Sequence, residues 1–287
     1  MRTILVPIDF STHSYHSAHF GLELAQQMDA RVVLLHVIPP SLYTPAFGMS
    51  VAVDTWNPLL HDQMTNALHR YKEELGTYQR QYCLTDVVIS TRIVVGQPAS
   101  AILEETATED VAFIVMSTVG AANDWDKLVG SVTSAVAQRA DQPVWIIPGD
   151  VRLDSLRQLA YFADLEGNEV SCINQVLNLG DRLRATLSRA TLKVVHVSPL
   201  DSEEFAITEA LISLFEDTYF SDRITRRHLT EGSVAEGIEA YVRIHQPDAI
   251  VLAHRNRGFM EAVFHVSLIR HLSLTTKRPL LIVTKPG

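Results

Sequence analysis

The sequence predicts an α/β protein made of two tandem repeats, each a five-stranded parallel sheet with helices on both faces. Apolar runs of strand length alternate with segments of helical period along the chain, a pattern that indicates a parallel sheet covered on both faces. The length of 287 residues suits two domains of ordinary size. The order of landmarks in the first half also returns in the second.

In the first half, the apolar runs predict strands at Thr3–Ile8, Arg31–Val37, Val87–Val95, Val111–Met116 and Pro143–Ile147. The helices predicted between them run from a cap at Ser11 or Thr12 to Met28 and over Asp62–Gln81, Pro98–Ala107 and Ser131–Arg139. The stretch from Pro39 to His61 has no clear period and is rich in proline and aromatic residues. A loop of this length is often a lid or a contact surface, and simple disorder or a surface excursion is the alternative.

The second half begins in the same way as the first. Gln158–Ala163 is followed by Asp164, as the first strand is followed by Asp9, and Leu192–Val197 repeats the strand that ends in His36-Val37. These matches predict that the second half starts with the same strand order.

Later landmarks share one spacing. Gly96 and Gly232 each open a helix, Pro143 and Pro279 each start a last strand, and both pairs are 136 positions apart. A constant spacing across strands and helices indicates a duplication, with one large mixed sheet as the alternative. The predicted domains are residues 1–150 and 151–287.

Composition excludes several classes of protein. The net charge of −9 and the pI near 5.7 argue against a non-specific nucleic-acid binder, which needs clustered Lys and Arg. No apolar segment approaches the roughly 20 residues that a membrane span requires, and the N-terminus does not fit a signal peptide. Cys83 and Cys172 fit neither a metal motif nor a disulfide framework, so both are expected in or near the core. These features predict a cytoplasmic protein.

The conspicuous polar residues follow predicted strands. Asp9 follows the first strand, His36 lies at the end of the second, and Ser117–Ser131 follows the fourth. In an open parallel sheet, ligands bind outside the carboxyl ends of the strands, where the strand order reverses. A helix that begins near Ser131 would present unpaired N–H groups to a phosphate. Asp9 would accept a hydrogen bond from an exocyclic amine or a ribose hydroxyl.

Several other histidine and aromatic residues are expected to have structural roles. His13, His16 and His19 are three residues apart, a spacing that drifts around a helix and does not converge on a metal ion. His36 and His196 recur at equivalent strand ends, which predicts a repeated structural hydrogen bond. Trp125 is expected to pack against its own loop, with stacking on a base as the alternative.

The sequence also lacks the common catalytic signatures. It has no Gly-x-Gly-x-x-Gly after the first strand, no Walker motif and no Gly-x-Ser-x-Gly elbow. No acid–base pair stands out as a catalytic set, so the chain is not expected to be an enzyme.

The segment after the fourth strand resembles the universal stress proteins, whose nucleotide motif is Gly-2x-Gly-9x-Gly-[Ser/Thr]. Ser117 takes the place of the first glycine, and Gly120, Gly130 and Ser131 match the rest with the same spacing. The opening Ile4-Leu5-Val6-Pro7-Ile8-Asp9-Phe10-Ser11, Leu35-His36-Val37 and Asp141-Gln142-Pro143-Val144-Trp145-Ile146-Ile147 also resemble that family. The resemblance covers essentially the whole chain, twice.

This resemblance implies a fold and a ligand. The family's fold is like that of the adenine-nucleotide α-hydrolases and is Rossmann-like, and its subunits dock through their last strands, so the two repeats are expected to form an intramolecular pseudo-dimer. Its nucleotide-binding members hold ATP across the strand ends, and Mg²⁺ would accompany the ATP. Asp9 and Val37 would contact the adenosine portion, and the phosphates would lie against Gly120, Gly130, Ser131, Val132 and Thr133. Pro7, Ile8, Met116 and Ser117 complete the implied cofactor-binding set.

Two departures from the motif bear on binding. Ser117 adds a Cβ where the family has bare backbone. In the second repeat, the 136-residue spacing places Ala253, Asn256 and Val266 at the three glycine positions, and only Ser267 matches. The second repeat is therefore expected to be a structural partner, with an anion held by its side chains as the alternative.

These observations predict a stress-response protein that binds adenine nucleotide in its first repeat, with little or no hydrolysis. The alternative is a nucleotide-free scaffold that acts by dimerisation and partner binding, and an enzyme of the wider α-hydrolase class ranks third. The partners considered are an unidentified protein and a second copy of the chain, while nucleic acid and membranes are not expected.

Overall fold

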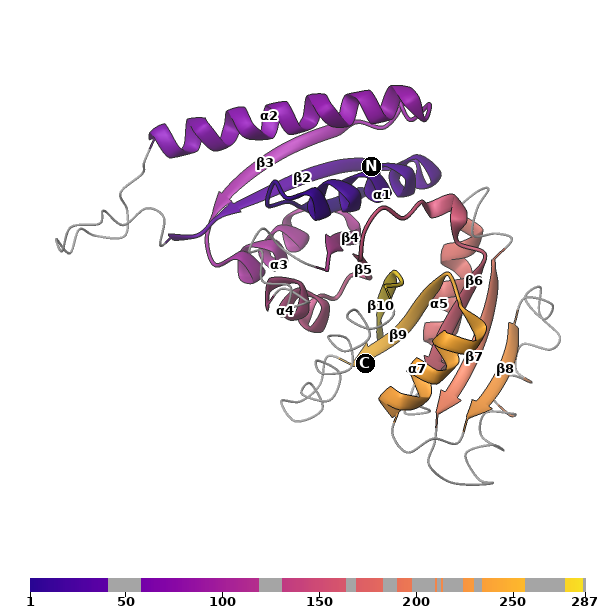
Figure 1. The fold of residues 1–287 in the computed structure, drawn as a ribbon. Coiled ribbons are helices and arrows are strands. Elements are labelled where there is room, and N and C mark those ends of the chain that lie inside the picture. The colour runs from indigo at the N-terminus through magenta and orange to yellow at the C-terminus, as the bar shows by residue number, and fades with distance from the viewer. Residues whose placement is uncertain are drawn as a thin grey trace.

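The computed structural model describes residues 1–40, 58–118, 131–163, 169–182, 190–197, 210, 213, 224–229, 234–255 and 277–285. Ten strands form one sheet in the order β3-β2-β1-β4-β5-β10-β9-β6-β7-β8 (Figure 1). The strands of the first half are β1 (Thr3–Pro7), β2 (Arg31–Ile38), β3 (Ile89–Val95), β4 (Val111–Ser117) and β5 (Val144–Ile147). Those of the second half are β6 (Gln158–Ala163), β7 (Thr191–Val197), β8 (Ile224–Leu229), β9 (Ala249–Arg255) and β10 (Leu280–Lys285).

The strand order is the same on either side of the centre. Within each half every strand pair is parallel, and the halves join where β5 pairs antiparallel with β10, with Trp145 opposite Leu281. The predicted fold class, two tandem five-stranded repeats docked as a pseudo-dimer, is therefore confirmed. The ten strands also form one sheet, which is mixed only at the antiparallel β5–β10 pair, and the repeated strand order on the two sides of that pair is the order that a duplication predicts. A domain division at residue 150 remains a prediction.

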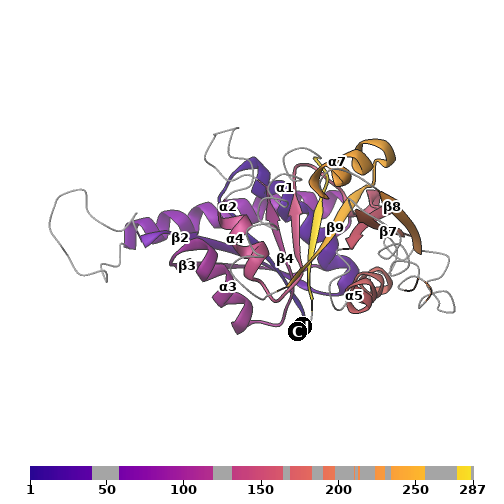
Figure 2. The ribbon, with the colours of Figure 1, turned by 90° about the horizontal axis from the view of Figure 1, so that it is seen from below.

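Helices cover both faces of this sheet. Among the described residues they are α1 (Thr12–Met28), α2 (Pro58–Gln81), α3 (Pro98–Thr108), α4 (Ser131–Arg139), α5 (Glu169–Arg182) and α7 (Val234–His245), with a short 3₁₀ turn, η2, at Leu153–Ser155. One core cluster lies on the face of α1, α2 and α5, and the other lies on the face of α3, α4 and α7. Both clusters contain residues of the two repeats, so the sheet has a continuous core on each face. Figure 2 shows the β9–β10 region between the strands of the two halves.

Helix α1 begins and packs as its sequence dictates. Ser11 has extended backbone and its side chain accepts a hydrogen bond from Ser14 N at 3.1 Å, which makes it an N-cap. At the middle of the helix, a Cβ on Gly21 would lie 2.8 Å from Val6 Cγ2. The absence of a side chain at Gly21 therefore lets α1 approach β1 closely, and this fixes the position of the helix over the strand.

The segment that joins the repeats is anchored to α1. Glu23 is buried, and its Oε2 accepts a hydrogen bond from Leu153 N at 2.8 Å. Its Oε1 accepts from Tyr78 Oη at 2.6 Å and lies 2.8 Å from Arg152 Nε, in an ion pair that is not aligned as a hydrogen bond. The Arg152 guanidinium also lies 4.1 Å from the centre of the Tyr82 ring. The buried carboxylate of Glu23 and the ring of Tyr82 thus hold the linker between the repeats to the first repeat.

His19 packs in the same α1–α2 interface, with its ring stacked on Tyr78 at 3.6 Å between centroids. Burial lowers the pKa of His19 from 6.5 to about 4. The unfolded chain therefore takes up a proton near pH 6.5 that the folded chain does not take up until about pH 4. As far as His19 is concerned, the free energy of unfolding does not depend on pH above 6.5. It is expected to fall as the pH drops from 6.5 to about 4.

The variant His19→Phe keeps a ring on Tyr78 and removes the site of protonation. We expect its unfolding free energy to fall less than that of the wild type between pH 6.5 and 4, by about 1–2 kcal/mol after allowance for partial solvent exposure. Urea denaturation at several pH values measures the difference. Parallel curves for the two proteins would contradict it.

Several details differ from the sequence prediction. Helix α2 starts at Pro58, four residues before the predicted Asp62. Cys172 is buried as expected, whereas Cys83 is exposed. Cys83 follows the end of α2 and has a left-handed conformation with φ 56°. The stretch 41–57 lies outside the described residues. None of the described helices is long and apolar enough to cross a membrane.

Candidate functional site

The sheet reverses its order at β1, which lies between β2 and β4. The chain leaves β1 for β2 on one side and reaches β4, its other neighbour, only after β3. All three strands are parallel, so their carboxyl ends open on the same edge of the sheet. This reversal is the place where ligands bind in open α/β sheets, and the predicted site residues lie around it.

A local side-chain hydrogen bond holds the turn after β1. Asp9 is half-buried, and its Oδ1 accepts from Ser11 N at 3.1 Å, just before the first turn of α1. Phe10 between them takes a left-handed conformation with φ 63°, which is uncommon for a residue with a large side chain. The turn therefore places the Asp9 carboxylate at the mouth of the reversal.

His36, near the end of β2, fixes the same turn from the side. Its Nδ1 lies 2.9 Å from the carbonyl of Ile8, so Nδ1 carries the hydrogen and donates it to that oxygen. Burial lowers the pKa of His36, which favours the neutral ring with Nε2 as an acceptor. His196 makes the equivalent contact with the carbonyl of Ala163 at 2.9 Å. The predicted repeated structural hydrogen bond is confirmed.

The end of β4 is tied to the start of α4. Thr133 is buried, and its Oγ1 donates a hydrogen bond to the carbonyl oxygen of Ser117 at 3.0 Å. Thr118 N donates to Ile147 O at 3.2 Å, which continues the β4–β5 pairing one residue further. The first turn of α4 is therefore pinned to the carboxyl end of β4, and its N–H groups begin beside Ser117. A helix start in this position favours an anion.

The other implied residues line this region in different ways. Val37 and Val132 are half-buried against the core on the α3–α4 face, and Met116 is buried within that core. Ile8 is buried, and its N–H donates to Leu35 O at 2.8 Å. Pro7, the last residue of β1, is half-buried, and Ser131 is exposed.

The structure thus brings together two groups of predicted residues, Asp9 with its turn and Ser117 with the start of α4. Gly120, Gly130 and Trp125 lie outside the described residues, as do Asn256, Val266 and Ser267 of the second repeat, whereas Ala253 is buried in β9.

Sequence reasoning missed the aromatic support of the Asp9 turn. The Phe10 ring lies 4.5 Å from the His36 ring and 6.0 Å from the ring of Tyr71, between centroids. Tyr71 is buried and comes from α2. The only signal for this cluster was the helical period of α2, which places Tyr71 with Leu68 and Leu75 on one apolar face.

Comparison with known proteins identifies relatives of the first half of the chain. The model of the universal stress protein family matches residues 1–148. The chain is 30% identical over 152 residues to universal stress protein MJ0531 of Methanocaldococcus jannaschii. The aligned region covers 51% of this chain and 81% of that protein. It is 27% identical over 159 residues to universal stress protein MJ0577 of the same organism, which covers 51% and 94%.

Solved structures resemble the whole chain. A universal stress protein from Archaeoglobus fulgidus DSM 4304 superposes with a TM-score of 0.69 at 18% identity and covers 99% of this chain and 97% of that one. A putative universal stress protein from Pseudomonas aeruginosa UCBPP-PA14 superposes with a TM-score of 0.63 at 13% identity, covering 99% and 93%. At these identities the likeness concerns the fold.

Proposed function

The chain belongs to the universal stress protein family, and we propose that its first half binds one adenine nucleotide, ATP, with little or no hydrolysis. The observation that carries the proposal is the junction of β4 and α4, where the Thr133–Ser117 hydrogen bond holds a helix start beside the strand reversal. Asp9 lies at the end of the neighbouring strand β1. One edge of the sheet therefore offers a carboxylate acceptor and an anion-binding helix start.

Each group has a separate task in this proposal. The Asp9 carboxylate accepts a hydrogen bond from the adenosine portion, and half-buried Val37 provides an apolar contact. The N–H groups of Ser131 and Val132, which begin α4, donate to phosphate oxygens. The Thr133 hydroxyl already donates to Ser117 O, so we assign it to holding the helix in place. We assign the residues from Gly120 to Gly130 to the phosphates on the family motif alone.

The described residues fit a nucleotide that brings its own metal ion. Among them, no group of three or more His, Cys, Asp or Glu side chains could hold a metal. Mg²⁺ would neutralise phosphate charge when it arrives with ATP, and the chain would bind the phosphates through backbone N–H groups. The absence of a recognised acid–base pair in the sequence supports binding with slow or no turnover.

Nucleotide binding would change a surface that a partner reads. The segment from Gly120 to Gly130 joins β4 to α4, and in this proposal bound phosphate determines the surface that the segment presents. The proposed role in the stress response is this nucleotide-dependent surface. In the alternative, the chain is a scaffold that binds a partner protein without nucleotide. Ser117 at the first motif position favours this alternative.

Isothermal titration with Mg-ATP tests the proposal through a matched pair of variants. We expect one site per chain, an affinity about tenfold lower or more in Asp9→Ala, and an unchanged affinity in Asp164→Ala, the equivalent position of the second repeat. Asp9→Asn keeps an oxygen for Ser11 N, so it separates the loss of the carboxylate from the loss of the turn. No binding by the wild type, or equal losses in Asp9→Ala and Asp164→Ala, would contradict the assignment.

A further inference from the structure

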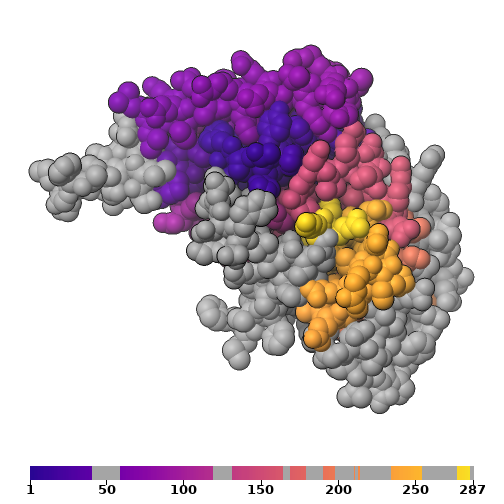
Figure 3. All heavy atoms as spheres, in the orientation of Figure 1, coloured from indigo at the N-terminus to yellow at the C-terminus, as the bar shows by residue number. Residues whose placement is uncertain are grey.

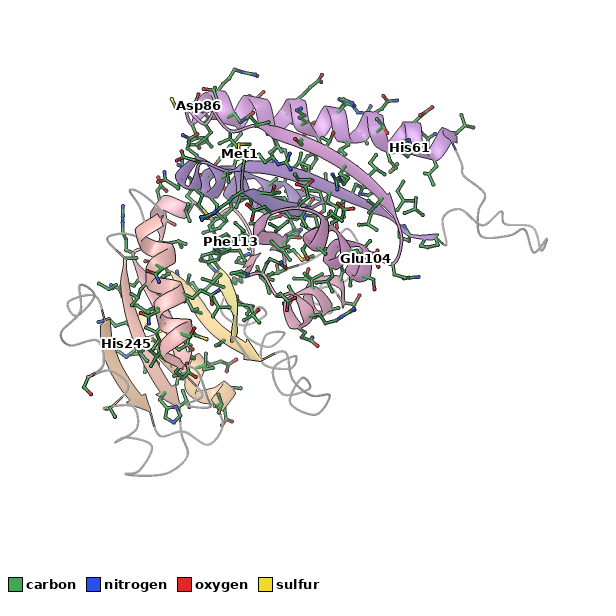
Figure 4. The ribbon with its side chains drawn as sticks, turned by 180° about the vertical axis from the view of Figure 1, so that it is seen from behind. Met1, His61, Asp86, Glu104, Phe113 and His245 are labelled. Carbon is green, nitrogen blue, oxygen red and sulfur yellow. The ribbon has the colours of Figure 1, made fainter. Side chains whose placement is uncertain are left out.

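A cavity of about 310 Å³ lies between the two repeats, at the edge of the sheet opposite the candidate nucleotide site. Its walls include the residues before or at the starts of β1, β4 and β5, together with side chains of α5 and β10. Ligand sites form preferentially where domains meet. In the view of Figure 4, Phe113, which lines the cavity, lies on the side of the first half that faces the second. Figure 3 shows the C-terminal strand at the junction of the halves.

Two opposite charges line this cavity without pairing. Arg2 and Asp110 precede the adjacent strands β1 and β4, and Thr3 N donates to Asp110 O at 2.8 Å. Both side chains are exposed, and within the described part of the chain neither forms an ion pair or a side-chain hydrogen bond. The guanidinium and the carboxylate therefore come from neighbouring positions before two adjacent strands, and neither charge is paired within the described residues.

The remaining walls divide into an apolar floor and polar amides. Phe113 and Val283 are buried and form the floor, with half-buried Met28 beside them. Gln175 and Asn178 come from one face of α5, and neither carboxamide is hydrogen-bonded within the described residues. An apolar floor with a few convergent polar groups is the usual pattern of a small-molecule site.

We propose that this cavity binds a small zwitterion with an apolar side chain, of the α-amino acid type. Asp110 takes the ammonium group, Arg2 takes the carboxylate, and the apolar side chain lies on Phe113 and Val283. A singly charged ligand would leave one of the two opposite charges without a partner, so both charges are needed for full affinity. Since the walls come from both repeats, the site exists only while the repeats are docked.

Ligand-observed NMR on the full chain tests this with three probes of one shape. L-leucine carries both charges, 3-methylbutylamine lacks the carboxylate, and 4-methylpentanoate lacks the amine. We expect saturable binding of leucine, about tenfold tighter than that of either analogue. Arg2→Gln should lower leucine affinity to that of the amine and leave the amine unaffected. Asp110→Asn should lower leucine affinity to that of 4-methylpentanoate and leave the affinity for 4-methylpentanoate unaffected.

Two cavity-filling variants test whether leucine binds in this cavity. Ala112→Trp fills the cavity from β4, and Asn178→Trp fills it from an exposed position of α5, so at least one is expected to fold, as checked by its thermal unfolding. Leucine binding should disappear in the folded variant, while Mg-ATP binding by that variant stays as in the wild type. No saturable leucine signal, equal binding of all three probes, or full binding by a filled variant would overturn the proposal.

Discussion

Trp145→Ala is expected to lower the free energy of unfolding by about 3–5 kcal/mol. Trp145 is fully buried at the centre of β5, opposite Leu281 of the second repeat, and its ring centroid lies 5.2 Å from that of Phe20 on α1. Truncation would leave a large cavity where both repeats and α1 meet. Because core residues of both repeats surround it, we expect one cooperative transition to shift in urea denaturation, followed by circular dichroism.

Trp145→Phe provides the control. The Trp145 Nε1 has no hydrogen-bond partner among the described residues, so a phenyl ring loses volume and no hydrogen bond. We expect it to cost less than half as much as the alanine variant. If Trp145→Ala instead melted one repeat and left the other folded, the idea of a continuous core would be wrong.

Glu23→Ala is expected to cost about 2–4 kcal/mol of unfolding free energy. The change removes the acceptor of Tyr78 Oη and of Leu153 N, and it leaves Arg152 without its buried partner. Leu153 and Leu156 of the linker are buried, so a weakened anchor would also loosen the linker. Limited proteolysis between residues 149 and 157 should accelerate along with the loss of stability.

Asp154→Asn is the matched control because it contacts the same arginine. Asp154 Oδ2 lies 3.2 Å from Arg152 Nη2, and its side chain is 59% exposed. Exposed ion pairs contribute at most about 1 kcal/mol, so this variant should resemble the wild type. Similar losses in the two variants would show that the buried position of Glu23 is unimportant.

The sequence was sufficient for the strands that alternate with helices and for the duplication. Buried parallel strands are continuous apolar runs, and the first-half strands were placed to within one or two residues of their ends. The sequence was less informative where polar residues take unusual positions. Helix α5 was not assigned, since the first of its buried positions is Glu169, whose Oε2 accepts a hydrogen bond from the hydroxyl of buried Tyr161. β8 was not assigned either, because Thr225-Arg226-Arg227-His228 is typical of an edge strand and not of a buried one.

The candidate site likewise combines features that the sequence predicted with features that it did not. Strand ends and motif spacing placed Asp9 and Ser117 at one edge of the sheet, which follows from parallel topology alone. The hydrogen bond from Thr133 to Ser117 O and the left-handed Phe10 were not predictable, since both depend on how helices pack over that edge. The cavity between the repeats was also beyond prediction, because its walls come from segments far apart in the chain.

The nucleotide content of the purified protein tests the central claim most directly. The protein is denatured, and the supernatant is analysed by ion-exchange chromatography for the wild type, Gly130→Val and Gly149→Val. A Cβ at Gly149 meets nothing within 4 Å, so that variant controls for the substitution itself. We predict close to one ATP or ADP per chain in the wild type and in Gly149→Val, and none in Gly130→Val. An empty wild type that also shows no thermal shift with added Mg-ATP would contradict the account and favour a nucleotide-free scaffold.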